Sequence, residues 1–231
     1  MITLHGMSSP NVVKVILMLE EIGEQYRFER CDVILNEQFS APFLNLNPNA
    51  KVPVIVDDSP AEDPVTIFES GAILFYLAEK SGQFLPPAGP GRYQVMQWVM
   101  FQMAGVGPMF GQAIHFRERP SGNAYAVERY KRELDRLCSV IDGELAKRPY
   151  IAGESYSIGD IALFPWMRTC SRYFPDVAFG SATRRWYDEI MQRPATVRTL
   201  ELLDGLSGTD RTSMKAATPE QILRYYGRPR D

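Results

Sequence analysis

The chain has 231 residues, of which 45% are hydrophobic, and its 25 basic and 28 acidic side chains give a formal net charge of -3 at pH 7. A chain of this length can bury a sizeable core in one or two domains. The slightly acidic balance leaves no electrostatic footprint for nucleic acid or for an anionic membrane surface, so we expect neither as a partner.

The three cysteines, Cys31, Cys138 and Cys170, are odd in number and far apart in the sequence. This pattern argues against a disulfide framework and favours a reducing compartment. No apolar run approaches the ~20 residues that a membrane-spanning helix needs, and the N-terminus lacks the basic start and apolar core of a signal peptide. We therefore expect a soluble, cytoplasmic protein.

The first eighty residues alternate between strand-like and helix-like patterns. In chain order these patterns predict a strand over residues 2–6, a helix over 12–22, a second strand holding Tyr26, Phe28 and Val33, strands over 52–56 and 65–68, and a helix over 70–80. The turn sequence at 57–60 should join the last two strands as an antiparallel hairpin. The order βαβ and then ββα predicts a thioredoxin-like α/β domain with a mixed sheet.

In such a domain the redox chemistry lies at the start of the first helix, where this chain reads Ser8-Ser9-Pro10-Asn11. A thioredoxin would need a Cys-x-x-Cys motif there to carry its own thiolate. We infer that any thiol chemistry of this chain uses a thiol brought in as a ligand.

The composition changes near the middle of the chain. Residues 86–91 read Pro-Pro-Ala-Gly-Pro-Gly, which neither continues a helix nor pairs as a strand. Beyond them apolar residues recur at helical spacing, which predicts an all-α second domain. We expect domains at 1–82 and 92–206, a linker at 83–91, and a C-terminal tail at 207–231 that contains a short helix. Ser157 and Asp160 fit a capping box ahead of a buried helix.

Four features in this order resemble the cytosolic glutathione transferases: Ser9 with Asn11, Val52-Pro53, Glu69-Ser70, and Ser157 with Asp160. The stretches 47–53, 68–74, 107–112 and 115–116 are similar to the bacterial nu class, whose members include glutathione-dependent disulfide reductases. That class usually has Thr where Ser9 stands, and Ser keeps the hydroxyl. The resemblance extends to about residue 205 and implies a thioredoxin-like domain followed by an all-α domain.

The resemblance also implies a set of site residues. Ser9 and Asn11 would hold the glutathione sulfur as a thiolate, and a cis bond between Val52 and Pro53 would present the Val52 backbone to the extended peptide. The remaining contacts implied are Ser70 to the γ-glutamyl carboxylate, Glu69 to the ammonium group, Gln38 to the main chain, Asn49 or Lys51 to the glycyl carboxylate, and Arg129 reaching in from the partner subunit of a homodimer.

Each of these residues also has an ordinary explanation. Ser9 before Pro10 fits a helix N-cap followed by proline, and Ser70 could cap the next helix, although capping leaves Glu69 unexplained. Val52-Pro53 could be a trans pair opening an edge strand. The polar groups at 38, 49 and 51 could be exposed loop residues, and Arg129 could form a surface ion pair with Glu133.

Three functions follow as alternatives. Glutathione, as one or two molecules per site or as glutathione disulfide, would be the co-substrate, and its thiolate would reduce a small-molecule disulfide. The same thiolate could instead be conjugated to an electrophile. The third alternative is a protein of the same fold that binds partners without catalysis. His5 and His115 lack neighbours at zinc-ligand spacing, so we expect no metal.

Overall fold

The computed structural model describes residues 1–60, 63–118, 123–175, 177 and 179–227. Contacts divide the chain into two compact units, Met1–Leu77 with Pro194–Asp231, and Ala78–Arg193. These units differ from the domains expected from the sequence, 1–82 and 92–206. The difference arises because the helix that begins at Pro194 packs on the first helix of the chain and so joins the first unit. Which parts of the chain fold independently stays a prediction.

A four-stranded mixed sheet forms the centre of the first unit. It consists of β1 (Ile2–Gly6), β2 (Tyr26–Arg30), β3 (Val54–Asp57) and β4 (Val65–Phe68), in the order β2-β1-β3-β4. β1 runs parallel to β2 and antiparallel to β3, and β3 pairs with β4 as the expected antiparallel hairpin. Leu4 lies opposite Phe28 on one side and Ile55 on the other.

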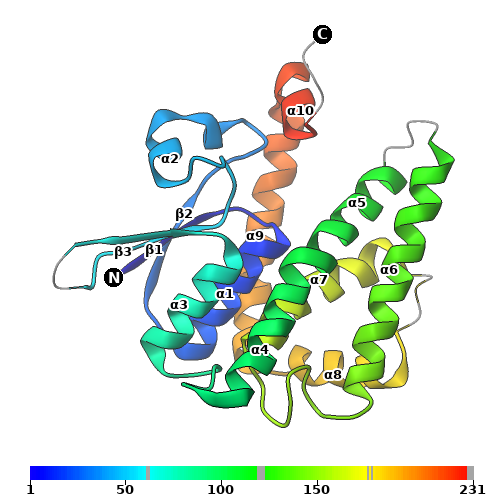
Figure 1. Cartoon of the computed structure of the whole chain (residues 1–231). Helices are drawn as coiled ribbons and strands as arrows, with labels where there is room; N and C mark the ends of the chain where they lie inside the picture. The colour runs from blue at the N-terminus through cyan, green and yellow to red at the C-terminus, as the bar shows by residue number, and fades with distance from the viewer. Residues whose placement is uncertain (61–62, 119–122, 176, 178, 228–231) are drawn as a thin grey trace. The chain divides into compact units, whose positions relative to one another are not determined.

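Three helices belong to this sheet. α1 (Pro10–Ile22) and α3 (Ser70–Ser81) cover one face, and α2 (Ala41–Leu46) lies on the other (Figure 1). α1 buries the continuous run Val12–Leu19, and its C-cap is Gly23, whose φ of 68° suits glycine. A one-turn 3₁₀ helix, η1 (Glu37–Phe39), precedes α2. The thioredoxin-like fold expected for this part of the chain is confirmed.

The prediction that Val33 belongs to the second strand is wrong. β2 ends at Arg30, and Asp32 Oδ1 accepts hydrogen bonds from the backbone N–H groups of Ile34 (3.1 Å) and Leu35 (3.2 Å). An aspartate that bonds the backbone two and three residues ahead folds the chain into a turn. Val33 therefore lies in this turn, and its side chain packs against a small apolar cluster beneath it.

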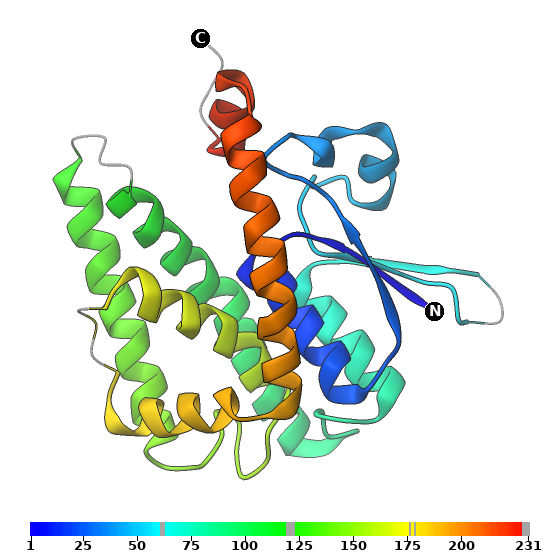
Figure 2. The ribbon, with the colours of Figure 1, turned by 180° about the vertical axis from the view of Figure 1, so that it is seen from behind.

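The C-terminal part of the chain is more helical than its polarity suggests. α9 runs from Pro194 to Ala216 beside α1 (Figure 2), and α10 covers Pro219–Tyr225. The short helix expected in the tail is thus present, but residues 207–216 belong to α9. Their polar side chains at Asp210 and Ser213 are buried against β2 and its following turn, which stabilises the helix there. The end of the predicted tail, 228–231, lies outside the described residues.

The described part of the second unit is built from helices. They are α4 (Gly89–Phe101), α5 (Gly107–Glu118), α6 (Ala124–Leu145), α7 (Ile158–Tyr173) and α8 (Ser181–Met191). α4 packs on α7, α5 on α6, and α6 on α8. A π-helical turn, η2 (Gln102–Val106), separates α4 from α5. The all-α domain expected from the sequence is confirmed.

Two local predictions for this unit have different outcomes. The Pro/Gly-rich linker at 83–91 is shorter than predicted, because α4 already begins at Gly89, and Pro90 fits the first helical turn, where no N–H partner is needed. The capping box is confirmed: Ser157 Oγ and the Asp160 carboxylate bond each other's backbone at the start of α7. In the described residues no helix is long and apolar enough to cross a membrane.

Candidate functional site

The turn between β1 and α1 places Ser9 at the N-terminus of a helix. Ser9 is half-buried, has an extended backbone (φ -90°, ψ 151°), and its Oγ accepts a hydrogen bond from the Val12 backbone N–H at 3.3 Å. This bond uses an oxygen lone pair and leaves the hydroxyl proton for another acceptor. Asn11, also half-buried, follows in the first helical turn. The helix end is therefore set up to hold an anion.

The residue before Ser9 is tied to the distant helix α9. The Ser8 backbone N–H donates to Asp210 Oδ2 at 3.0 Å, and the Ser8 hydroxyl donates to the same carboxylate. Arg30, at the end of β2, also donates to Asp210. The turn that carries Ser9 is thus held by a carboxylate about two hundred residues away in sequence.

Arg30 extends this network into the turn after β2. Its Nη2 donates to Asp32 Oδ2 at 2.6 Å and to Ser213 Oγ at 2.9 Å. Burial disfavours the charged guanidinium, but the bonds to Asp210 and Asp32 outweigh that effect and raise the pKa of Arg30. Burial likewise pushes the pKa of Asp32 up, and the bonds from Ser213, the Leu35 backbone and Arg30 more than offset this and lower it. Arg30 and Asp32 are therefore held in their charged forms.

The second part of the site is the loop between α2 and β3. The Val52-Pro53 peptide bond is cis, as expected. Asn47, which is buried, shapes the loop: its Nδ2 donates to the Lys51 carbonyl at 2.7 Å and its Oδ1 accepts from the Asn49 backbone at 2.9 Å. Ala50, with φ at 53°, completes the turn. Asn49 and Lys51 are exposed and Val52 is half-buried ahead of the β3 ladder.

Gln38 is not an exposed loop residue. It lies in η1 with 6% of its surface exposed, and its Nε2 donates to the Val33 carbonyl at 3.3 Å. Its Oε1 is buried and accepts no hydrogen bond from any residue that the structure describes. Val33 and Val52 pack against the same cluster, Cys31, Phe43 and Val54. Gln38 Oε1 is thus an unsatisfied acceptor in the part of the unit that also holds the cis-proline loop, and it could accept a hydrogen bond from a ligand N–H.

The third part of the site is the junction of β4 and α3. Glu69 is exposed and has φ at 72°, an unfavourable backbone conformation for a residue with a side chain. Ser70, only 2% exposed, opens α3. Beneath it lies Lys14 of α1, fully buried, whose Nζ donates to Ser70 Oγ at 3.2 Å.

The sequence interpretation missed Lys14, although a signal was present. A lysine in the middle of the apolar run from Val12 to Leu19 has no solvent to face and needs a partner. Burial lowers the pKa of Lys14 to about 7, and the neighbouring Glu69 carboxylate opposes that shift only in part. Ser9, Asn11, Lys14 and Ser70 all belong to the same compact unit.

Arg129 lies in the other unit, exposed on α6. Together with Met109, Tyr130, Arg132, Glu133 and Arg136 it lines a surface cavity of about 620 Å³. Glu133 forms its hydrogen-bonded ion pair with Arg136, at 2.7 and 2.9 Å, rather than with Arg129. Arg129 also helps to lower the pKa of Glu133, but its charge acts more weakly than the hydrogen-bonded Arg136.

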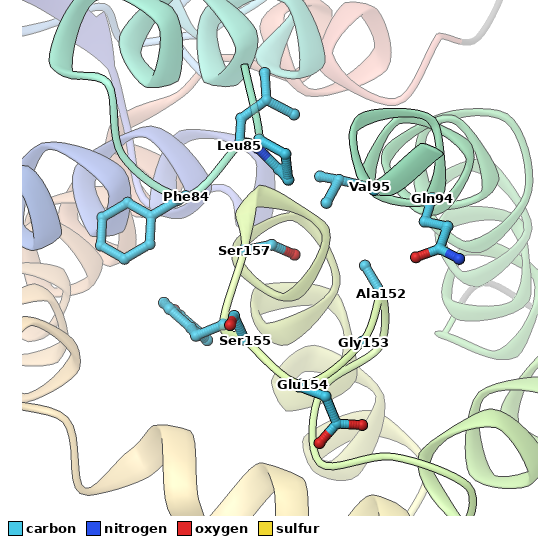
Figure 3. Close-up of a pocket in the computed structure, with 12 residues that line it drawn as sticks. Phe84, Leu85, Gln94, Val95, Ala152, Gly153, Glu154, Ser155 and Ser157 are labelled. Carbon is cyan, nitrogen blue, oxygen red and sulfur yellow. The ribbon is translucent and has the colours of Figure 1, made fainter. Parts of the chain in front are cut away.

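A further cavity of about 380 Å³ lies within the second unit and is lined by none of the predicted catalytic or glutathione-binding residues. Figure 3 shows Gln94 and Val95 of α4 facing the segment from Ala152 to Ser157. Ser157 in this wall donates to Asp160 Oδ2 at 3.0 Å, so part of the wall is the cap of α7. In the described residues no group of three or more His, Cys, Asp or Glu side chains is placed to hold a metal ion.

The protein's own thiols are poorly placed for nucleophilic chemistry. All three cysteines are free and buried. Burial, with the carboxylates of Glu37 and Asp32, raises the pKa of Cys31 to about 12. A hydrogen bond with Cys138, together with burial, raises the pKa of Cys170 as well. Because the thiolate is the reactive form, Cys31 and Cys170 are inert near neutral pH.

Comparison with known proteins identifies relatives over most of the chain. Residues 1–79 match the model of the "Glutathione S-transferase, N-terminal domain" and residues 98–194 that of the "Glutathione S-transferase, C-terminal domain". The disulfide-bond oxidoreductase YfcG of Escherichia coli is 43% identical over 87% of this chain and 94% of its own.

Two solved structures are similarly close. A glutathione transferase family member from Pseudomonas fluorescens, with two glutathione molecules bound, has 42% identity and a TM-score of 0.80 over 87% of this chain and 92% of its own. A glutathione transferase from Pseudomonas putida, with one glutathione disulfide bound per subunit, has 41% identity and a TM-score of 0.80 over 86% and 90%.

Proposed function

The chain belongs to the glutathione S-transferase family, and from this premise we propose that it activates glutathione as a thiolate and uses it to reduce disulfides. The observation that carries the proposal is the helix end at Ser9, which has a hydroxyl where a thioredoxin has its cysteine, in a protein whose own cysteines are buried. The reacting sulfur must then come from the ligand. The relatives that bind glutathione disulfide or act on disulfide bonds support this choice of reaction.

The site residues divide the work of binding glutathione between them. Ser70 and the N-terminal amides of α3 receive the γ-glutamyl carboxylate, Glu69 pairs with the ammonium group, and the Val52 backbone pairs with the cysteinyl peptide. Gln38 takes a main-chain N–H with its buried Oε1, and Asn49 or Lys51 meets the glycyl carboxylate.

The sulfur then lies at Ser9 and Asn11. A hydroxyl donor and the positive end of α1 both favour the thiolate over the thiol, so they lower the thiol pKa. Bringing that pKa from ~8.5 to near neutral needs about 2 kcal/mol of preferential stabilisation. A hydrogen bond from Ser9 together with the helix end is of this size.

The reaction proceeds in two exchanges. The glutathione thiolate attacks one sulfur of the substrate disulfide, forming a mixed disulfide and releasing the other half as a thiolate, which takes a proton from solvent. A second glutathione thiolate attacks the glutathione sulfur of the mixed disulfide, giving glutathione disulfide and the second substrate thiol. Two glutathione molecules are thus oxidised for each disulfide reduced.

Turnover of hydroxyethyl disulfide with glutathione tests the proposal. We expect activity well above the uncatalysed exchange, and a fall of about tenfold or more in kcat/KM for Ser9→Ala, the loss of one hydrogen bond to a charged group. Ser139→Ala, an exposed hydroxyl on α6, is the matched control and should leave the rate unchanged. Turnover at the blank rate alongside rapid conjugation of a chloronitrobenzene would favour conjugation instead. Calorimetry showing no binding of glutathione or its disulfide would favour the non-catalytic alternative.

We also propose that the protein is a cytoplasmic homodimer of the nu class, in which Arg129 reaches the partner's glutathione. The exposed guanidinium of Arg129, with Glu133 engaged by Arg136, supports this role, and three free cysteines suit a reducing compartment. Sedimentation at the mass of a monomer would overturn the dimer. A crystal soaked in glutathione should show its sulfur at Ser9.

A further inference from the structure

Lys14 is a fully buried lysine whose amine contacts the residue at the start of α3. None of its surface is exposed, and its Nζ lies 3.2 Å from Ser70 Oγ, which is itself 2% exposed. Lysine is almost never fully buried unless it is paired or functional. The contact made here is with the residue that opens α3, where the proposed function puts the γ-glutamyl carboxylate.

The protonation state of Lys14 decides which way this hydrogen bond runs. A charged ammonium group has three donors and no acceptor, so Ser70 Oγ must accept from it and the Ser70 hydroxyl proton must point to another acceptor. A neutral amine has a lone pair and can accept the Ser70 hydroxyl proton itself. The charged form therefore always leaves the Ser70 O–H to an acceptor other than Lys14, such as a ligand carboxylate, whereas the neutral form can take that proton itself.

The charges around Lys14 leave its two forms close in energy. Burial lowers the pKa of Lys14 to about 7, opposed in part by Glu69 at the start of α3. Carboxylates on the neighbouring elements have other partners, which are Arg198 for Glu20 of α1 (2.6 Å), Tyr76 for Asp57 of β3 (2.8 Å), and Ser8 and Arg30 for Asp210 of α9. Near neutral pH a new negative charge at Ser70 would thus shift the balance toward the ammonium form.

We propose that Lys14 is a positioning residue that couples binding of the ligand's carboxylate at Ser70 to the uptake of a proton. The inference rests on the proposed function, because it takes the carboxylate to be that of the γ-glutamyl group. Lys14 does not touch the ligand. It acts through Ser70, by fixing the direction of the hydroxyl and by supplying a positive charge behind it.

Calorimetry with S-methylglutathione tests the coupling, because this ligand keeps the γ-glutamyl carboxylate and has no thiol to ionise. Titrations at about pH 8 in two buffers with different ionisation heats give the number of protons taken up. An opposite charge nearby raises an amine pKa by ~1–3 units, so from a starting pKa of about 7 the uptake should be roughly 0.4 to 0.9 protons per ligand. Binding without proton uptake would overturn the inference.

Variants separate charge from titration. Lys14→Met should bind S-methylglutathione about tenfold more weakly and take up no more than the small fraction of a proton due to the ligand's amino group. Lys14→Arg keeps a permanent charge and should retain affinity while losing the uptake. Lys80→Met, an exposed lysine in the last turn of α3, is the control and should match the wild type.

The outcomes also distinguish this inference from the proposed function. If the wild-type protein binds S-methylglutathione and Lys14→Met binds it equally well with the same uptake, the inference is wrong and the proposed function stands. If the wild-type protein does not bind it, the proposed function is wrong and the inference is overturned with it. The wild-type measurement alone decides the question if a Lys14 variant fails to fold.

Discussion

Asp210 should control the position of Ser9, although it lies about two hundred residues further along the sequence. Replacing it with Ala removes the acceptor for the Ser8 backbone N–H at 3.0 Å, for the Ser8 hydroxyl and for Arg30. The turn before Ser9 then loses its connection to α9. Arg30 keeps its bonds to Asp32 and Ser213, so no guanidinium is left buried without a partner.

The size of the effect follows from the bonds that are lost. Hydrogen bonds to a charged group contribute ~1.5–3 kcal/mol each, and bonds sharing one carboxylate are not additive, so we expect Asp210→Ala to cost about 2–4 kcal/mol of unfolding free energy. At ~2–4 °C per kcal/mol for a chain of this size, Tm should fall by roughly 5–15 °C. A reacting group misplaced by about 1 Å can cost ~100-fold in rate, so kcat should fall more than binding of glutathione does.

Thermal unfolding and the disulfide-reduction assay, run on the same preparations, measure the two effects. Asp204→Ala is the matched control, since Asp204 lies on the same helix and is exposed. Asp210→Asn should fall between the two, because an amide oxygen accepts fewer bonds than a carboxylate. An Asp210→Ala protein that unfolds at the temperature of the Asp204→Ala control and keeps its kcat would refute the reasoning.

Two further predictions concern other buried polar groups. Asp160→Asn should destabilise the protein by about 2–4 kcal/mol. The NH₂ group of the new side chain would replace a carboxylate oxygen that accepts hydrogen bonds either from Ser157 or from Ile151 and Trp186. An unchanged midpoint in chemical denaturation would contradict this. Burial raises the pKa of Asp160 to about 6, so the folded state binds its proton more tightly and this group's contribution to stability falls as pH rises from about 4 to about 6, a dependence that the Asn variant should lack. Gln38→Leu should raise the KM for glutathione several-fold, since it removes the buried acceptor Oε1, which has no partner among the described residues. It should also cost about 1 kcal/mol of stability, since it removes the bond from Nε2 to the Val33 carbonyl. An unchanged KM would exclude Gln38 from the binding site.

Local patterns were sufficient to predict most of the first unit. Alternation and helical spacing located β1, β4 and α3 almost to the residue, because the period of the apolar residues is a local property of the sequence. The helix N-cap Ser9 was found for the same reason, since its capping bond to Val12 is local. Ser70 was found through the Glu69-Ser70 pair on which the family resemblance rests. The prediction that Val33 lies in the second strand failed because a single side chain, Asp32, turns the backbone through hydrogen bonds that apolar spacing does not reveal.

Contacts between distant segments could not be predicted in this way. Asp210 looked like a polar tail residue, and only its partners Ser8 and Arg30 show why a helix continues through it. Lys14 could be recognised as unusual within an apolar run, but its partner Ser70 is fifty-six positions further along the chain. Sequence spacing can show that a polar residue lies on a face that should be buried. Only the fold shows which residue it contacts there.

The bond between Ser8 and Asp210 also has a consequence for the order of events during synthesis. The two residues are separated by 202 positions, so at ~5–20 residues per second roughly 10 to 40 seconds pass between their appearances from the ribosome. Throughout that time the strands and helices of the first eighty residues can form, but the turn at Ser9 has only its local bonds and lacks the one to Asp210. The half of the protein that is made first acquires its finished site last.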